Sequence, residues 1–305
     1  MRQVLIVHYS QSGQLNQLVE SVSAPLREQS EVQVDYLELH MQTPFPFPWP
    51  FLKFFRIFPE TVLMQSQPLQ PLAVDADKKY DLIILAYQVW FLSPSLPMSS
   101  FLASPEAAKL LHGTPVMTLI GCRNMWLIAQ EKMKKKLIEL NAHLVDNAVL
   151  TDACGSAMSF LSTPLWMFTG KKQAYAWVPK AGIAASQIAA ARRFGEAVRT
   201  RLLQDREPIA APMLKGLAAV SIDEKLIASE RIGARSFYLW SRLLRALGQP
   251  DSRMRGAGLL FYIVFLLCMI VTVVPLTALL KKVLSPLTKQ RIAREKAYFA
   301  QPSGE

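Results

Sequence analysis

The sequence predicts a doubly wound α/β domain with a five-stranded parallel sheet, followed by a basic amphipathic helix and an apolar helix. Five apolar runs of strand length alternate with segments of helical period, a pattern typical of strand–helix–strand units. One run, 82–86, is continuously apolar, as expected for a parallel strand buried on both faces. Five such strands favour the order 2-1-3-4-5, which places ligands at the carboxyl ends of strands one and three.

Each element is expected from its own local pattern. The predicted strands are 4–7, 32–39, 82–86, 115–120 and 144–150. The predicted helices are 15–22, 97–112, 129–140 and 183–203. The uncharged stretch 156–168 is too short to span a membrane. We expect it to form a helix that packs near the ligand site or near the membrane.

The chain divides into a main domain and a C-terminal membrane region. Residues 1–204 form the predicted α/β domain, and residues 205–222, which contain two prolines, are expected to be a linker. The membrane region is expected to comprise an amphipathic helix at 223–248, a transmembrane helix at 256–280 and a basic tail at 281–305.

The first candidate site is the turn between strand 4–7 and the helix after it. Backbone N–H groups at the start of that helix, and the positive end of its dipole, favour an anion such as phosphate. Ser10 and Ser12 add hydroxyl donors, and Gly13 lets the backbone approach a ligand closely. The spacing Ser-x-Ser-Gly-x resembles the phosphate loop of flavodoxin-like FMN proteins, which carry a further hydroxyl where this chain has Leu15. The resemblance implies FMN in the 1–204 domain, with its phosphate held by Ser10, Gln11, Ser12, Gly13, Gln14 and Leu15.

The second candidate is the loop after strand 82–86. An isoalloxazine ring needs an apolar stacking surface and backbone N–H donors for its pyrimidine oxygens. The loop offers aromatic rings on a proline-braced backbone, similar to the aromatic loop of flavodoxins and flavodoxin-type quinone reductases. Tyr87 is expected to act in catalysis, and the flavin ring to contact Gln88, Val89, Trp90 and Phe91.

The third candidate loop follows strand 115–120 and contains Gly121, Cys122, Arg123 and Asn124. A cation near N1 and O2 of a flavin stabilises the anionic reduced ring. We expect Arg123 to play that catalytic role; a surface arginine without such a role is the alternative. Cys122 is expected to be a small buried residue rather than a nucleophile, because the sequence shows no His or Lys partner for it.

Whole phrases of the sequence resemble a narrower bacterial family over residues 1–205. Tyr-Ser-Gln-Ser-Gly-Gln-Leu, Pro-Phe-Pro-Phe-Pro-Trp and Ile-Gly-Cys-Arg-Asn-Met-Trp are similar to segments of proteins known as dialkylresorcinol condensing enzymes. The resemblance implies an aromatase that oxidises an alkylated cyclohexanedione to a resorcinol, because the ketosynthase of that pathway performs the condensation. That ketosynthase is then a candidate partner.

Residues 44–55 begin with prolines that alternate with aromatic residues. Such prolines exclude both a helix and a central strand. Two interpretations stay open. The segment is either a loop that packs its rings onto the domain, or an apolar lid or membrane-dipping surface near the ligand.

The C-terminal apolar run, Gly256–Leu280, holds 25 residues without a charge between basic flanks, a length that can span a bilayer. Pro275 leaves room for a kink or a re-entrant arrangement. In the helix before it, aromatic and leucine side chains share one side and four arginines the other. That pattern suits either a position among lipid headgroups or docking onto the domain. The first strand follows the amino terminus without signal-peptide features, so we expect the main domain at the cytoplasmic face of the cytoplasmic membrane.

The net charge of +11 concentrates after residue 192, around the apolar segment. Attraction to anionic lipid explains this better than nucleic-acid binding does. Three cysteines lie far apart and four histidines are scattered, so we expect neither a disulfide framework nor a metal site.

The leading hypothesis is therefore a membrane-tethered, FMN-dependent oxidoreductase that acts on a lipophilic ring substrate, either a quinone or an alkylated cyclohexanedione. NAD(P)H is the candidate electron donor, and a homodimer is the candidate assembly. Two alternatives stay open: an electron-transfer flavodoxin-like protein, and a membrane scaffold without a cofactor. Such electron carriers are usually acidic and diffusible, whereas this chain is basic and carries an apolar segment.

Overall fold

A computed structural model describes residues 1–204 and 207–304, without the side chains of residues 156, 157 and 273–288. Its centre is a five-stranded sheet in the order β2-β1-β3-β6-β7, with every neighbouring pair parallel. This confirms the predicted doubly wound fold and strand order, which is that of flavodoxin-like proteins. The strands are β1 (Arg2–His8), β2 (Val32–Glu38), β3 (Leu82–Tyr87), β6 (Pro115–Cys122) and β7 (His143–Thr151).

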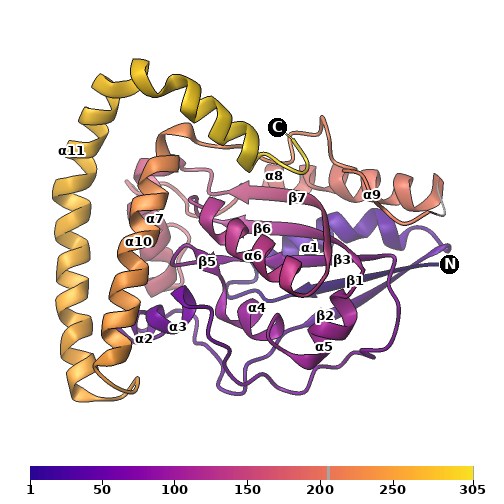
Figure 1. Cartoon of the computed structure of the whole chain (residues 1–305), viewed down its shortest axis with the longest axis horizontal. Helices are drawn as coiled ribbons and strands as arrows, with labels where there is room; N and C mark the ends of the chain where they lie inside the picture. The colour runs from indigo at the N-terminus through magenta and orange to yellow at the C-terminus, as the bar shows by residue number, and fades with distance from the viewer. Residues whose placement is uncertain (205–206, 305) are drawn as a thin grey trace.

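Helices cover both faces of the sheet (Figure 1). Because successive strand residues point to opposite faces, β1 divides its side chains between two cores: Leu5 and Val7 lie in one, Val4 and Ile6 in the other. The first core is covered by α4 (Leu96–Phe101), α5 (Pro105–Leu111) and α6 (Leu127–Glu139). The second is covered by α1 (Gln14–Arg27), α8 (Ala185–Ala190) and α9 (Arg192–Gln204).

Two helices that the sequence predicts as continuous are each divided in the structure. The segment 97–112 breaks between α4 and α5, where Ser104 accepts a hydrogen bond from the backbone N–H of Ala107 and Pro105 opens the second helix. Proline suits that first position, because its missing N–H is not needed there. The segment 183–203 divides between α8 and α9.

The aromatic segment contains two short helices, α2 (Phe51–Arg56) and α3 (Phe58–Val62). The expectation of no helix within 44–55 is thus wrong for its last residues. The physical reason is positional: Pro50 precedes the first turn of α2, and Pro59 lies in the first turn of α3, where no backbone donor is lost. The backbone N–H of Trp49 donates to the carbonyl of Met167 at 2.9 Å, which ties this segment to α7 (Gly155–Thr169).

Residues 209–222, in the region expected to be a linker, pack against the sheet. The backbone N–H of Val149 in β7 donates to the carbonyl of Ala219 at 2.8 Å. The carboxylate of Asp146, fully buried in β7, accepts hydrogen bonds from the backbone of Met213 and Leu214 and from the hydroxyl of Ser303. This segment and the last residues of the chain therefore cover the β7 edge.

The C-terminal third contains α10 (Glu224–Ala246) and α11 (Arg253–Phe299). In Figure 1, α11 runs alongside α10 and then bends back, so that its last turns lie beside the sheet domain. Its section Arg253–Thr272 is long and apolar enough to cross a membrane. The second half of the predicted 256–280 span extends into residues whose side chains are not described.

Candidate functional site

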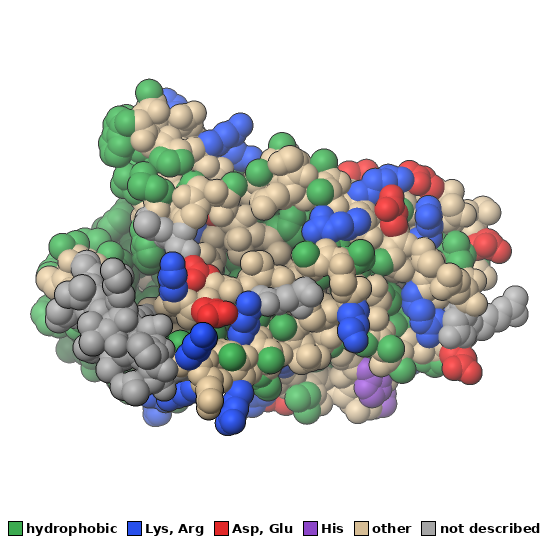
Figure 2. Space-filling model, turned by 90° about the horizontal axis from the view of Figure 1, so that it is seen from above, with side chains coloured by type: hydrophobic (Ala, Val, Ile, Leu, Met, Phe, Trp, Pro, Cys, Tyr) green, Lys and Arg blue, Asp and Glu red, His purple; other side chains and the backbone are tan. Residues whose placement is uncertain are grey.

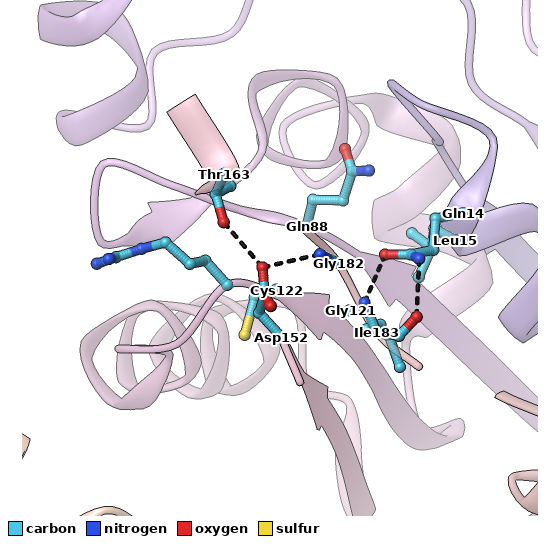
Figure 3. Close-up of a pocket in the computed structure, with 10 residues that line it drawn as sticks. Gln14, Leu15, Gln88, Gly121, Cys122, Asp152, Thr163, Gly182 and Ile183 are labelled. Carbon is cyan, nitrogen blue, oxygen red and sulfur yellow. Dashed lines mark hydrogen bonds between the residues drawn. The ribbon is translucent and has the colours of Figure 1, made fainter. Parts of the chain in front are cut away.

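The three loops that the sequence singles out meet in one small, open pocket at the carboxyl ends of the strands (Figure 3). Six predicted residues line the pocket: Gln14 and Leu15 from the first loop, Gln88 from the second, and Gly121, Cys122 and Arg123 from the third. Four further lining residues were not predicted from the sequence and come from the end of β7, from α7 and from the segment before α8. They are Asp152, Thr163, Gly182 and Ile183.

The first loop presents free backbone donors at the start of α1. Gly13 adopts φ +78°, a conformation that costs glycine little, and precedes the first helical residue. In the described part of the chain, nothing accepts a hydrogen bond from the N–H of Ser12, Gly13 or Gln14. The N–H of Leu15 is already used, because it donates to the hydroxyl oxygen of Ser10 at 3.1 Å.

Gln11 does not line the pocket, and its hydrogen bonds connect two other segments. Its backbone N–H lies 3.4 Å from Oε1 of Gln88, which joins the first loop to the second. Its side-chain Nε2 donates to the carbonyl of Pro46 at 2.7 Å, and the hydroxyl of Tyr9 donates to its Oε1. The side chain of Gln11 therefore ties the aromatic segment to the first loop. Gln14, on the other side of the turn, lines the pocket.

The second loop is a tight hairpin formed by β4 (Val89–Trp90) and β5 (Ser93–Pro94). Phe91 and Leu92 occupy its turn with φ of +49° and +58°, a conformation that is uncommon for residues other than glycine. Trp90 is nearly buried and makes edge-to-face contacts with aromatic rings outside the loop, at centroid distances of 5.5–6.0 Å, namely those of Tyr9, Phe45 and Trp49. Val89, Trp90 and Phe91 are therefore absent from the pocket lining, and their contact with a flavin stays a prediction.

In the third loop, Arg123 lies beneath α7. Its guanidinium stacks 4.1 Å from the ring centroid of Phe160, and one nitrogen lies 3.4 Å from the hydroxyl of Ser159. Burial lowers the pKa of Arg123 from its usual value. Burial also raises the pKa of the Cys122 thiol, which keeps that sulfur protonated and weakly nucleophilic at neutral pH. The side chain of Asn124 accepts a hydrogen bond from the N–H of Met125 at the loop's end and does not line the pocket.

Tyr87 lies outside the pocket. It is fully buried, and its hydroxyl donates to Oε1 of Gln130 at 2.7 Å. Gln130 in turn donates to Thr118, which donates to Oδ1 of Asn147 at 3.0 Å. This chain of buried bonds joins β3, α6, β6 and β7, and the geometry gives the Tyr87 hydroxyl no access to a ligand. Its catalytic role stays a prediction without support from its position.

Asp152 organises the side of the pocket that the sequence analysis missed. Its carboxylate accepts hydrogen bonds from the hydroxyl of Thr163 and the N–H of Gly182, both at 2.8 Å (Figure 3). It also accepts one from the N–H of Cys154 at 3.0 Å. The signal was present in the sequence, because Asp152 comes just after predicted strand 144–150 at the ligand-bearing end of the sheet.

Gly182 brings the segment before α8 against the first loop. Its φ is +94°, and a Cβ at this position would lie 2.8 Å from Oε1 of Gln14. That close approach allows the Gln14 amide to exchange two hydrogen bonds with the backbone of Ile183, at 3.0 and 3.1 Å. The buried Gln14 side chain therefore closes the floor of the pocket, and its backbone N–H stays available at the start of α1.

The donor set fits the phosphate of FMN. Three free N–H groups and the Ser12 hydroxyl lie at the positive end of a 14-residue helix. Gln14 lines the pocket, and Ser10, Ser12 and Gly13 lie beside it, outside its lining. The nearby carboxylate of Asp152 already accepts three hydrogen bonds, so its charge is stabilised within the protein. Leu15 is buried in the core and supplies no hydroxyl, and its N–H belongs to Ser10. This loop therefore offers fewer donors than the pattern that it resembles.

Solved flavoprotein structures resemble this chain in fold. A flavoprotein in complex with FMN from Lactobacillus acidophilus has 16% identity and a TM-score of 0.40, with 49% of this chain and 93% of that chain covered. A WrbA-like flavodoxin from Agrobacterium tumefaciens has 10% identity and a TM-score of 0.38, with 67% and 99% covered. An NADH:FMN oxidoreductase in its apo form has 11% identity and a TM-score of 0.36, with 69% and 95% covered. No family model and no curated protein matches the chain.

Proposed function

We propose that this chain is an FMN-dependent oxidoreductase that works at a membrane surface. The observation that carries the proposal is the meeting of three loops in one pocket at the carboxyl edge of the sheet. Each loop is predicted from its own sequence to contact a different part of FMN. Ligands of doubly wound sheets bind at that edge, near the point where the strand order reverses.

In this proposal, each loop has its own role in binding FMN. The free N–H groups of Ser12, Gly13 and Gln14, with the Ser12 hydroxyl, bind the phosphate. Arg123 supplies positive charge on the side of the third loop, and its stacking on Phe160 keeps the guanidinium in place. The helix α7, which carries Phe160, covers that loop and limits access of water. FMN, when bound, accepts and donates hydride equivalents, chemistry that no side chain of this pocket offers by itself.

The proposed substrate is a lipophilic ring compound, because aromatic side chains connect the second loop with the apolar C-terminal helices. Phe91 contacts Phe54 at a centroid distance of 4.7 Å and Phe58 at 5.1 Å. Phe58 stacks on Tyr262 of α11 at 4.4 Å. A quinone or an alkylated cyclohexanedione, the latter oxidised to a resorcinol, has the apolar ring that such a surface favours. NAD(P)H as donor for quinone reduction, a homodimer and a ketosynthase partner belong to the same proposal, as does location at the cytoplasmic face.

The visible spectrum of the detergent-purified full-length protein tests the proposal. We expect the bands of bound oxidised flavin at about 450 nm. Ser12→Glu should abolish flavin retention, because a carboxylate would occupy the phosphate position and repel it. Ser30→Glu, which adds the same charge at an exposed position before β2, is the matched control and should retain flavin. A colourless native protein that does not take up added FMN would overturn the proposal.

A further inference from the structure

The outer faces of α10 and α11 carry large apolar side chains that nothing in the described chain covers. On α11, Leu260, Val264, Leu267 and Val271 are exposed and spaced four, three and four residues apart, which places them on one stripe. On α10, Ile232, Leu239 and Leu243 form a similar exposed stripe. Figure 2 shows hydrophobic side chains gathered at the end of the molecule where these helices lie.

The start of α11 is fixed to the main domain by a buried ion pair. Both carboxylate oxygens of Glu60 in α3 lie within hydrogen-bond distance of the Arg255 guanidinium, at 2.6 and 2.8 Å. The side chains are only 5% and 10% exposed, so water screens this pair little. Beyond it, α11 packs along α10 through Trp240, whose ring lies 5.1–5.9 Å from those of Phe261, Tyr262 and Phe265.

The far end of α11 returns to the same domain. Glu295 pairs with Arg231 of α10 at 2.6 Å, and Phe299 is buried in the core beside β7. After the helix, the fully buried Ser303 donates to Asp146 and accepts from the backbone N–H of Asn147, both at 2.7 Å. Residues before and after the apolar section therefore both pack on the main domain and α10. A single crossing of the membrane by α11 would place these residues on opposite sides.

An upright crossing also conflicts with the charges on α10. The section Arg253–Thr272 is 20 residues, or about 30 Å, long, which is enough to cross the hydrocarbon core only if it stands upright. Because α10 packs along it, an upright α11 would carry α10 into the hydrocarbon. Charged side chains are costly there, and the exposed residues of α10 include Arg235, Arg242 and Arg245.

We infer that α10 and α11 lie flat in one leaflet of an anionic phospholipid bilayer, so that the described segments before and after the apolar section stay on the same side. The two apolar stripes face the acyl chains, and the exposed arginines reach the anionic headgroups. The inference deepens the proposed membrane location and rests on it. It is independent of flavin binding.

Flat docking sets the candidate pocket close to the lipid. The strands direct their carboxyl ends toward α10 and α11 (Figure 1). Glu230 of α10 accepts a hydrogen bond at 2.7 Å from the N–H of Ile128, in the first turn of the helix that follows the third loop. A lipophilic ring compound dissolved in the leaflet therefore meets the aromatic side chains around the pocket without leaving the membrane surface.

Protease access to the two chain ends tests the inference in the full-length protein. A cleavable tag is placed on each end, and exogenous protease is added to spheroplasts and to inverted membrane vesicles. Both tags should respond alike, cleaved in one preparation and protected in the other. Cleavage of one tag in spheroplasts and of the other in inverted vesicles would show a single crossing and overturn the inference.

A depth measurement gives a second, independent readout. Leu260→Cys and Val271→Cys are spin-labelled one at a time in a background with the three native cysteines replaced by alanine. The protein is bound to vesicles of phosphatidylcholine and phosphatidylglycerol. The positions lie about 16 Å apart along α11. Labels at equal, shallow depth support flat docking, whereas depths that differ by about this distance overturn it.

Flotation with the same vesicles separates the possible failures. Native protein should float, and more weakly when phosphatidylglycerol is omitted. Protein that stays in solution as a dimer buried through these stripes would overturn both the inference and the membrane part of the proposed function. The flavin spectrum is measured without vesicles, so it reports on the pocket whichever way the membrane experiments end.

Discussion

Helices α6 and α11 both pack on the sheet domain, but they present opposite outer surfaces. The outer face of α6 carries lysines paired with glutamates, such as Lys136 with Glu139 at 2.7 Å, and its inner face buries Met133 and Leu137. The outer face of α11 carries a stripe of leucine and valine, and a buried charge, Arg255, lies at its inner side. The first pattern suits water. The second suits an apolar surrounding, which is why we place α11 against lipid.

The largest expected effect comes from charging the outer stripe of α11. Leu260→Glu combined with Val264→Glu should release the protein from phosphatidylcholine–phosphatidylglycerol vesicles in flotation. Removing two large apolar side chains from lipid costs about 4 kcal/mol, or roughly a thousandfold in partitioning. Ile138→Glu, an exposed apolar residue on the outer face of α6, is the matched control and should float like the native chain. Unchanged flotation of the double variant would show that the outer surface of α11, like that of α6, does not contact lipid.

Next in size is the buried ion pair at the start of α11. Arg255→Ala leaves the Glu60 carboxylate buried without its partner, which typically costs 3–5 kcal/mol. We expect a lower thermal midpoint and faster proteolysis in the loop between α10 and α11. The solvent-exposed pair Arg192–Glu28 provides the comparison, since Arg192→Ala should leave the thermal midpoint nearly unchanged. Equal effects of the two variants would argue against a buried anchor.

The pH dependence of folding stability should report on Glu230, a carboxyl on the buried side of α10. Burial raises the pKa of Glu230 to about 7 from an ordinary value of 4.5, and its Oε2 has no partner among the described residues. Between these two pKa values the folded chain binds the proton more tightly than the unfolded chain. Folding stability from this group therefore falls as pH rises from below 4.5 to above 7, by about 3 kcal/mol.

The Glu230→Gln variant checks this dependence, because it keeps an acceptor for the N–H of Ile128 and removes the titrating carboxyl. Thermal midpoints in detergent at pH 5 and pH 8, values taken roughly on either side of the titration, should differ less for the variant than for the native chain. Glu139→Gln, on the exposed face of α6, should leave the native dependence unchanged. A native chain equally stable at both pH values would contradict the burial of an ionisable carboxyl at this position.

The smallest expected effect comes from removing a helix cap, and its cost should be the same in the sheet domain as in α11. Ser104 caps α5 in the water-facing domain, and Ser252 caps α11, each accepting a backbone hydrogen bond at 3.1–3.2 Å. Replacing either serine with alanine should cost about 1 kcal/mol. Hydrogen exchange should show the loss in the first turn of the helix concerned. A much larger loss at Ser252 would indicate that the cap also positions Arg255.

The sequence predicts the central sheet well, because its signals are local. Continuous apolar runs and intervening helical periods fix five strands and their order, as the parallel pairing of β1 with β2 and β3 confirms. The cover over β7 had no such signal. It depends on contacts such as those from Asp146 to Met213 and to Ser303, 67 and 157 residues apart, which leave no periodic trace.

The candidate site divides in a similar way. Residues at the carboxyl end of a strand or just after it, such as Gln14, Gly121 and Arg123, reach the pocket because parallel strands end along one edge of the sheet. Trp90 and Phe91 do not line it, because their rings find partners in the aromatic segment around Trp49 and Phe54. The choice between a ligand and a ring from a distant segment depends on tertiary packing. Residue type alone does not reveal it.

The bond between Ser303 and Asp146 has a consequence for how the protein is made. Strand β7 leaves the ribosome long before its final partner, since the two residues are separated by 157 positions. During that interval the carboxylate of Asp146 lacks one of its donors, and the apolar part of α11 emerges first. The apolar section of α11 is therefore synthesised before the buried bond that completes the partners of Asp146 can form.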